Sequence, residues 1–216
     1  KILVDHVTPG WMTFADGFKS SSSSKTAKRC FDILASSVLL SVAWPFMLLT
    51  ALAIKLEDGL RAPVFFRQER VGQFGKRFAV LKFRSMTVNA EGDGKAVWAT
   101  KNDSRVTRVG AFIRKTRIDE LPQIINVLKG DMAFIGPRPE RPEFVEQLAE
   151  RIPYYQARHC VKPGITGWAQ LCYPYGASEE DAKQKLQFDL YYVKNNSLFL
   201  DFMITLNTVE VVLFGK

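Results

Sequence analysis

The sequence is poor in the residues that build metal clusters and disulfide frameworks. Its 216 residues include 3 cysteines and 2 histidines, and no two cysteines form a Cys-x-x-Cys pair. Structural zinc sites and disulfide scaffolds need several such residues at fixed spacing, so both classes are disfavoured and three reduced thiols are expected. The Walker A and Gly-x-Gly-x-x-Gly patterns are also missing. These absences argue against the two common phosphate loops of nucleotide-binding domains.

Acidic residues are outnumbered, with 22 Asp and Glu against 30 Lys and Arg, for a net charge of +8. A basic balance suits nucleic acid, an anionic membrane surface or a phosphorylated substrate. The basic residues are interleaved with acids and form no continuous tract, which disfavours nucleic acid. The predicted partners are therefore a lipid bilayer and a phosphorylated substrate, with no nucleic acid.

Charge is absent altogether from Ile33 to Ile54, and Trp44-Pro45 lies in the middle of that run. At ~1.5 Å per residue the run is long enough to cross a bilayer. A spanning helix carries its basic excess on the cytoplasmic side only. Here both flanks are basic, through Lys25, Lys28 and Arg29 before the run and Arg61, Arg67, Arg70, Lys76 and Arg77 after it. Two paths stay open: a spanning helix, or a re-entrant helix that bends at Pro45 and returns.

The rest of the chain divides into short strand and helix patterns. Residues 1–26 are predicted to be an N-terminal segment whose Ser20–Ser24 run is a flexible linker, 27–56 the membrane helix, and 57–216 a cytoplasmic domain. In that domain, strands are predicted near 63–67 and 78–84, and helices near 106–114, 119–128, 140–152, 179–195 and 197–214. The predicted fold class is α+β, helix-rich with a small strand element.

Asp119-Glu120 is the sharpest candidate for chemistry, because it stands within a basic stretch, Arg114-Lys-Thr-Arg117-Ile-Asp119-Glu120-Leu-Pro-Gln. At the start of a helix both acids lie in a positive local field, which keeps a carboxylate ionised as a nucleophile or Mg²⁺ ligand must be. Arg114 and Arg117 could hold an anionic substrate. The alternative interpretation is that Asp119 caps the helix and Glu120 favours its dipole.

Three further patterns suggest phosphate or nucleotide contacts. Arg138 stands between two prolines, which fix its backbone for bidentate phosphate binding. Lys82 and Arg84 share one strand face at period two. The turn with Pro163, Gly164, Thr166 and Gly167 offers backbone N–H groups and precedes Trp168, which could suit a nucleotide base. Each pattern is also compatible with a solvated strand face or a simple loop.

Taken in order, these motifs resemble those of the bacterial sugar transferases called monotopic phosphoglycosyl transferases, over roughly residues 27 to 214. The matching segments are the membrane run with Pro45, Phe66-Arg-Gln-Glu-Arg-Val-Gly72, Lys82-Phe-Arg-Ser-Met86, the Asp119-Glu120 stretch, Leu128-Lys-Gly-Asp-Met132, Gly136-Pro-Arg-Pro139, Lys162-Pro-Gly-Ile-Thr-Gly167, Asp189-Leu-Tyr-Tyr192 and Leu200-Asp201.

The resemblance implies transfer of a sugar-1-phosphate from a UDP-sugar to a polyprenyl phosphate, with release of UMP. It implies that Asp119 is the covalent nucleophile, that Glu120 assists with Mg²⁺ or the lipid phosphate, and that Arg114 and Arg138 steady phosphate oxygens. Such a carboxylate splits phosphoryl transfer into two steps. A non-enzymatic alternative is a basic, membrane-anchored scaffold of a polysaccharide assembly complex.

The resemblance also implies a re-entrant helix broken at its proline, interfacial helices, and a catalytic domain on the cytoplasmic face of the bacterial inner membrane. Small members often place a serine before the proline, whereas this chain has Trp44, so Ser41 or Thr50 is expected to offset the break. The N-terminal stretch is similar to what precedes the catalytic part of long members, which predicts a truncated long form. The sugar, the exact polyprenol and whether the chain is a homodimer stay open.

Overall fold

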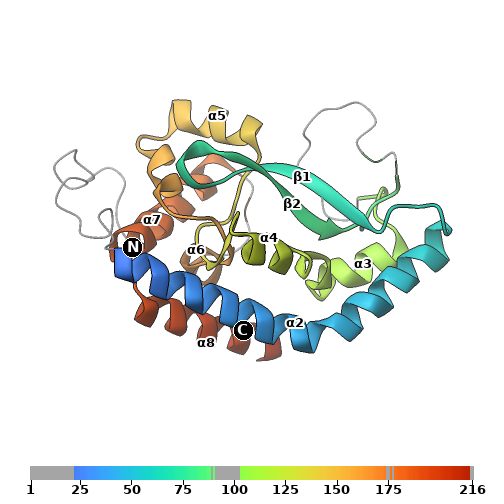
Figure 1. Cartoon of the computed structure of the whole chain (residues 1–216). Helices are drawn as coiled ribbons and strands as arrows, with labels where there is room; N and C mark the ends of the chain where they lie inside the picture. The colour runs from blue at the N-terminus through green and yellow to red at the C-terminus, as the bar shows by residue number, and fades with distance from the viewer. Residues whose placement is uncertain (1–21, 89, 91–102, 174–175, 177, 215–216) are drawn as a thin grey trace.

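A long, bent helix, α2 (Ser22–Asp58), runs along one side of the molecule in the computed structural model (Figure 1). The structure describes residues 22–88, 90, 103–173, 176 and 178–214. The other elements are β1 (Phe65–Val71), the 3₁₀ turn η3 (Gln73–Gly75), β2 (Arg77–Phe83), α3 (Arg108–Lys115), the 3₁₀ turn η4 (Ile118–Glu120), α4 (Gln123–Lys129), β3 (Ala133–Ile135), α5 (Pro142–Arg151), the 3₁₀ turn η5 (Tyr155–Cys160), β4 (Gly164–Thr166), α6 (Trp168–Cys172), α7 (Glu179–Asn195) and α8 (Leu198–Phe214).

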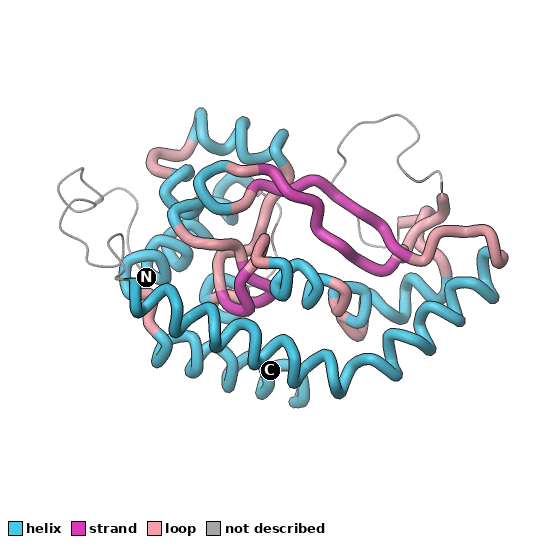
Figure 2. The backbone as a smooth tube through the Cα atoms, in the orientation of Figure 1, coloured by secondary structure: helices cyan, strands magenta, loops and turns pink. Residues whose placement is uncertain are grey.

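The chain is helix-rich with a small strand element, as the sequence predicts (Figure 2). β1 and β2, which lie near the two predicted strands, form an antiparallel hairpin, and β3 and β4 form a short parallel pair that the sequence patterns do not predict. The predicted helix over 179–195 is confirmed as α7, whose first turn is fixed by a capping box in which Ser178 and Asp181 exchange hydrogen bonds.

Asn126 of α4 attaches the hairpin to the helices. Its side-chain amide donates to the Ala79 carbonyl at 2.8 Å and accepts from the Leu81 N–H at 3.0 Å, so it pairs with β2 as a strand would. Val80 and Val127 are fully buried between these elements. Asn126 therefore sets the height of β2 over α4, and with it the position of the next residue, Lys82.

Both ends of α2 contact the same domain. Near its start, Lys28 forms an ion pair with Asp201 at 2.6 Å, and Arg29 donates to the last carbonyls of α4, those of Val127 and Leu128. At its end, Glu57 accepts from the first two N–H groups of α3, a favourable place for a carboxylate. Asp58 pairs with Arg84 just beyond β2, at 2.6 Å.

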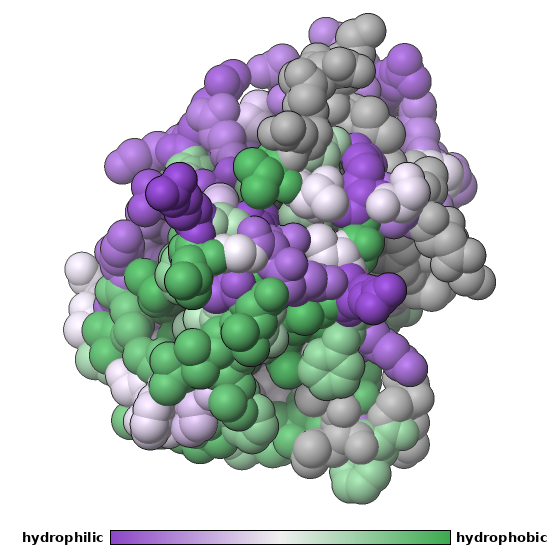
Figure 3. All heavy atoms as spheres, turned by 90° about the vertical axis from the view of Figure 1, so that its right-hand side faces the viewer, coloured by the Kyte–Doolittle hydropathy of each residue, from purple (hydrophilic) through white to green (hydrophobic). Residues whose placement is uncertain are grey.

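Apolar side chains cover the outer side of α2 and the neighbouring helix α8. We call this surface the apolar belt; its exposed members include Leu34, Val38, Val42, Leu49 and Leu56 of α2 and Phe199, Phe202, Leu206, Val209 and Phe214 of α8. The hydrophobic residues gather on the same side in the space-filling view, away from the hydrophilic upper part (Figure 3). Among the described helices, α2 is long and apolar enough to cross a membrane.

Three local expectations are wrong. Ser22–Ser24 belong to α2, so the serine run is not a linker there, and residues 1–21 lie outside the described residues. Asp119 and Glu120 form η4, separate from α4, so no single helix covers 119–128. Pro45 lacks the N–H that would bond to the Ser41 carbonyl, and the Ser41 hydroxyl donates to the Ser37 carbonyl at 2.9 Å, so of the two residues expected to offset the break Ser41 does not do so.

Candidate active site

The Asp119-Glu120 turn is placed by the helix before it and by a strained residue. Gly110 of α3 lies so close to the Ser85 carbonyl that a Cβ atom would stand 2.0 Å from that oxygen, which holds α3 against the segment after β2. After α3, Arg117 has φ 60, a left-handed conformation that costs a non-glycine residue about 1–2 kcal/mol. The chain therefore leaves the helical path here and re-forms as η4.

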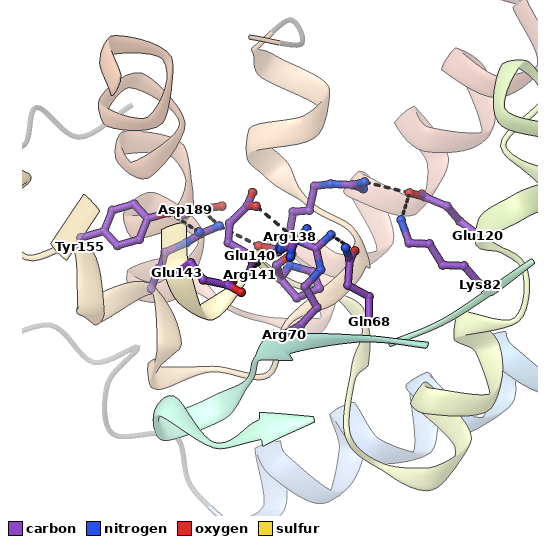
Figure 4. A network of polar contacts seen from close by, with 12 residues as sticks. Gln68, Arg70, Lys82, Glu120, Arg138, Glu140, Arg141, Glu143, Tyr155 and Asp189 are labelled. Atoms are coloured by element: carbon purple, nitrogen blue, oxygen red, sulfur yellow. Dashed lines mark hydrogen bonds and ion pairs between the residues drawn. The ribbon is translucent and has the colours of Figure 1, made fainter. Parts of the chain in front are cut away.

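Glu120 is held by two cations from distant parts of the chain (Figure 4). Its Oε1 accepts from Lys82 Nζ of β2 at 3.0 Å and from Arg138 Nη2 at 2.8 Å. Its side chain is 12% exposed. Burial alone would raise the pKa of Glu120, but the charges of Arg138 and Lys82 outweigh it and hold that pKa well below the usual range. Glu120 is thus an ionised, fixed anchor.

Asp119 has the opposite surroundings. Its Oδ1 is buried and has no hydrogen-bonding partner among the described residues. Burial, with the neighbouring Glu120 charge, raises the pKa of Asp119, and the charges of Lys82, Arg117 and Arg114 oppose that rise. An unpartnered buried carboxylate oxygen is rare because it is costly. Asp119 is therefore the group in this turn that is free to react or to bind.

Arg138 is positioned through its backbone by a second buried ion pair (Figure 4). Arg158 forms an ion pair with Asp189 of α7 at 2.7 Å and donates to the Arg138 carbonyl at 2.9 Å. Both side chains of the pair are at most 6% exposed. A buried pair that also satisfies a backbone carbonyl fixes the strand-like segment after β3, from which Arg138 reaches Glu120.

The glycine turn predicted to bind a nucleotide packs against the segment that carries Arg138. A Cβ atom on Gly164 would lie 2.1 Å from the Gly136 nitrogen, and one on Gly167 would lie 2.2 Å from the Gly136 oxygen. The Pro163 carbonyl accepts from Ala133, and the Thr166 hydroxyl contacts that of Thr208. These residues have a packing role, and their nucleotide contact stays a prediction.

The other predicted phosphate ligands are spread around the turn. Lys82 and Arg138 meet at Glu120, whereas Arg84, on the same strand face as Lys82, is buried against Asp58. Arg114 is half-buried and Arg117 exposed, and the charges of both act on Asp119. The structure thus brings Lys82 and Arg138 into contact with the carboxylate pair and directs Arg84 to the end of α2.

The carboxylate pair fits a magnesium ion by its donors. The free Oδ1 of Asp119 and the Glu120 carboxylate supply oxygen ligands, and Mg²⁺ commonly takes one or two carboxylates together with substrate phosphates. No group of three or more His, Cys, Asp or Glu within the described ranges could form an all-protein metal cage. The site therefore suits an ion that arrives with a phosphorylated substrate.

A family model described as bacterial sugar transferase matches residues 23–215. The chain belongs to the bacterial sugar transferase family.

Several curated relatives of this bacterial sugar transferase carry substrate names. A UDP-N-acetylgalactosamine-undecaprenyl-phosphate N-acetylgalactosaminephosphotransferase of Aeromonas hydrophila is 51% identical over 188 residues, 87% of this chain and 44% of the relative. A UDP-glucose:undecaprenyl-phosphate glucose-1-phosphate transferase of Escherichia coli is 44% identical, over 88% of this chain and 40% of the relative. The uncharacterized sugar transferase EpsL of Bacillus subtilis is 41% identical, over 88% of both chains. The chain thus spans less than half the length of the first two.

Sequence reasoning about this sugar transferase missed residues that shape the site without forming a local pattern. Arg70 and Gln123 line a small depression beside Lys82 and Arg138. Gln123 belongs to the stretch around Asp119-Glu120 that carries the family resemblance, but no pattern in the sequence indicates that its side chain lines the site. Arg70 is one of several arginines on a strand, and only the hairpin's docking on α4 shows that it points toward the site.

Proposed function

We propose that the chain transfers a sugar-1-phosphate from a UDP-sugar to polyprenyl phosphate, releasing UMP, as the first membrane step of exopolysaccharide or glycan assembly. The observation that carries this proposal is the division of roles between neighbouring carboxylates: Glu120 is fixed by Lys82 and Arg138, while Asp119 keeps a buried oxygen open. The substrate names of the relatives support the same reaction.

The reaction proceeds in two displacements at one phosphorus atom. An oxygen of Asp119 bonds to the β-phosphorus of the UDP-sugar while the bond from that phosphorus to the bridging oxygen breaks, so that UMP leaves. A phosphate oxygen of polyprenyl phosphate then attacks the same phosphorus and displaces Asp119, giving polyprenyl-diphosphate-sugar. Arg138, Lys82, Arg114 and Arg117 stabilise the negative charge that crowds this centre.

Mg²⁺ held by Asp119 and Glu120 would neutralise charge on the substrate diphosphate. Because Asp119 must be ionised to attack and burial raises its pKa, the rate should fall as the pH drops through that raised pKa. The cations already around Asp119 act in the direction that keeps it ionised.

We also propose that α2 is re-entrant and that the apolar belt lies in the cytoplasmic leaflet of the bacterial inner membrane, with α8 at the interface. The support is that both ends of α2 contact one domain, through Lys28 and Arg29 at the start and Glu57 and Asp58 at the end. A straight spanning helix would separate those ends by a bilayer. Pro45 lies inside the helix, where a missing N–H favours a bend.

Purified protein in detergent, given Mg²⁺, undecaprenyl phosphate and a panel of UDP-sugars, tests the reaction. We expect UMP release with at least one sugar and a labelled sugar-phosphate adduct on the protein when the lipid is withheld. Asp119→Asn should abolish both signals, whereas Asp131→Asn, an exposed residue of the same type, should retain them. Full turnover by Asp119→Asn would reject the covalent mechanism.

The scaffold alternative predicts a different outcome. Vesicle binding would survive loss of both Asp119 and Glu120, and no UDP-sugar tried would yield UMP. Topology is tested separately, with single cysteines introduced by Thr26→Cys and Leu60→Cys in a background from which the native cysteines are removed. Both are exposed positions beside the two ends of α2. A membrane-impermeant thiol reagent should label both from the cytoplasmic side, and labelling from opposite sides would reject re-entry.

A further inference from the structure

A small polar depression adjoins the carboxylate pair on the hairpin side. Its lining residues are Arg70, Val80, Lys82, Gln123, Arg138 and Pro139. The hairpin, which supplies Arg70, Val80 and Lys82, lies across α4 from α2 (Figure 1). Lys82 and Arg138 connect it to Glu120. The depression therefore adjoins the reacting centre, with which it shares Lys82 and Arg138.

Gln123 is the residue that marks the depression as a binding site. Gln123 is 3% exposed, and its amide makes no hydrogen bond among the described residues but is not sealed from solvent, because it lines the depression. A largely buried amide without a partner in the protein is open to hydrogen bonds from water or a ligand. As the first residue of α4, Gln123 is fixed by the helix behind it. Its free amide therefore points to a ligand that hydrogen-bonds in the depression.

Arg70 makes the depression suitable for an anion. Its guanidinium donates to Gln68 at 2.5 Å and lies 3.6 Å from Glu140, and the side chain is 15% exposed (Figure 4). Together with Lys82 and Arg138 it gives three cations around the depression, where Val80 is the one apolar side chain apart from Pro139. A planar guanidinium and an amide beside it can share the oxygens of one phosphate.

We propose that this depression binds the phosphate that leaves with the nucleotide, with Arg70 and Gln123 as its specificity-determining ligands. The inference rests on the proposed function: when Asp119 attacks one phosphorus of the UDP-sugar, the neighbouring phosphate departs as part of UMP and needs its own cations. Lys82 links the two positions, because it lines the depression and its charge also acts on Asp119. The phosphate of the lipid substrate, the other source of the same chemistry, would approach from the apolar belt.

The test compares UMP with uridine, because only UMP carries the phosphate. Equilibrium dialysis of purified protein should show that Arg70→Met and Gln123→Leu each weaken UMP binding about tenfold, as expected for one hydrogen bond to a charged group. Uridine binding should not change. Gln123→Glu should weaken UMP binding more than Gln123→Leu, because a carboxylate repels phosphate. Arg77→Met is the matched control, since Arg77 is an exposed arginine on the same hairpin.

Steady-state kinetics separates the two phosphates. The KM for the UDP-sugar should rise in Arg70→Met and Gln123→Leu while the KM for polyprenyl phosphate stays unchanged, and Arg70→Lys should restore part of the loss. A raised KM for the lipid instead would assign the depression to the lipid phosphate and overturn the inference. Parallel losses of UMP and uridine binding, or no loss of either, would also overturn it. Absence of UMP release by the wild type would reject the proposed function itself.

Discussion

Two buried polar clusters tie this domain together, and they differ in how completely they satisfy their own atoms. In the docking cluster, formed by Lys28, Tyr192 and Asp201, Lys28 Nζ has three acceptors: Asp201 Oδ2, the Tyr192 hydroxyl and the Ile135 carbonyl. The Tyr192 hydroxyl also contacts the second oxygen of Asp201, at 2.7 Å. In the active-site cluster, Glu120 is as well satisfied, but a buried oxygen of Asp119 has no hydrogen-bonding partner among the described residues.

The difference in hydrogen-bond satisfaction indicates which cluster stabilises the fold and which one binds a ligand. Folding favours buried polar groups only when they are paired, so a purely structural cluster is expected to complete itself, as the docking cluster does. Among the described residues, unpaired buried atoms also occur in Ser36, Arg84, Arg158 and Gln187, and Asp119 is the one carboxylate among them. The docking cluster joins α2 to α8 and to the backbone of β3, three residues before Arg138. It therefore supports the site without belonging to it.

The largest expected effect is a loss of turnover without a loss of stability in Asp119→Asn. Removing a nucleophile should lower kcat on the order of 10³-fold or more. Because Oδ1 is buried and unpartnered, replacing the carboxylate with a neutral amide should leave the melting temperature unchanged or raise it. UMP release and thermal unfolding in detergent, measured on the same preparations, check this prediction. A clear drop in melting temperature would mean that Asp119 stabilises the fold.

The reverse outcome is expected for Asp201→Asn. It leaves the Lys28 ammonium without its counter-charge at a fully buried partner, which should cost about 3 kcal/mol of stability. The kcat of the folded fraction should change far less than in Asp119→Asn. Thermal unfolding measures the loss of stability, and kinetics normalised to the folded fraction measure kcat. Asp131→Asn is the control, because Asp131 is exposed. A normal melting temperature with lost turnover would mean that the docking cluster takes part in catalysis.

Much of the fold follows from local patterns, but the pairing inside the site does not. The hairpin, α7 and the membrane-length helix have periodicities and turns that a sequence displays. Glu120, in contrast, meets Lys82 and Arg138 only because Asn126 places β2 over α4 and Arg158 fixes the chain at Arg138. Such long-range hydrogen bonds produce no periodic pattern in the sequence.

The left-handed residue between α3 and η4 was unpredictable for a different reason. A glycine would have marked this position, but the residue is Arg117, whose strain is held by its surroundings. Arg84 likewise shares the strand face of Lys82, as the period-two pattern predicts, but the end of α2 supplies Asp58 as its partner. The period-two pattern predicts which strand face a side chain lies on, but only the tertiary structure determines which charged group it pairs with.

The smallest expected effect concerns His159, a buried polar group outside both clusters. Its Nδ1 lies 3.1 Å from Gln156 Oε1, so the neutral ring donates to the amide oxygen. Burial, reinforced by the Arg158 charge, lowers the pKa of His159 to about 3, from 6.5. Between these values the unfolded chain binds more protons than the folded one, so stability is lost as the pH falls below about 6.5.

Acidification from pH 7.5 to 5.5 should therefore cost about 1 kcal/mol through this one residue. In His159→Gln, which cannot take up a proton, the melting temperature should fall less over the same interval, and the difference between the two slopes measures the contribution of His159. If the melting temperature fell equally in the variant and the wild type, the pKa of His159 would be the same in the folded and the unfolded chain. Because His159 contacts neither Asp119 nor Asp201 in the described structure, the pH profile of kcat should be the same in the variant and the wild type. A shifted profile would connect this third polar group to the active-site cluster and weaken the separation between stability and function.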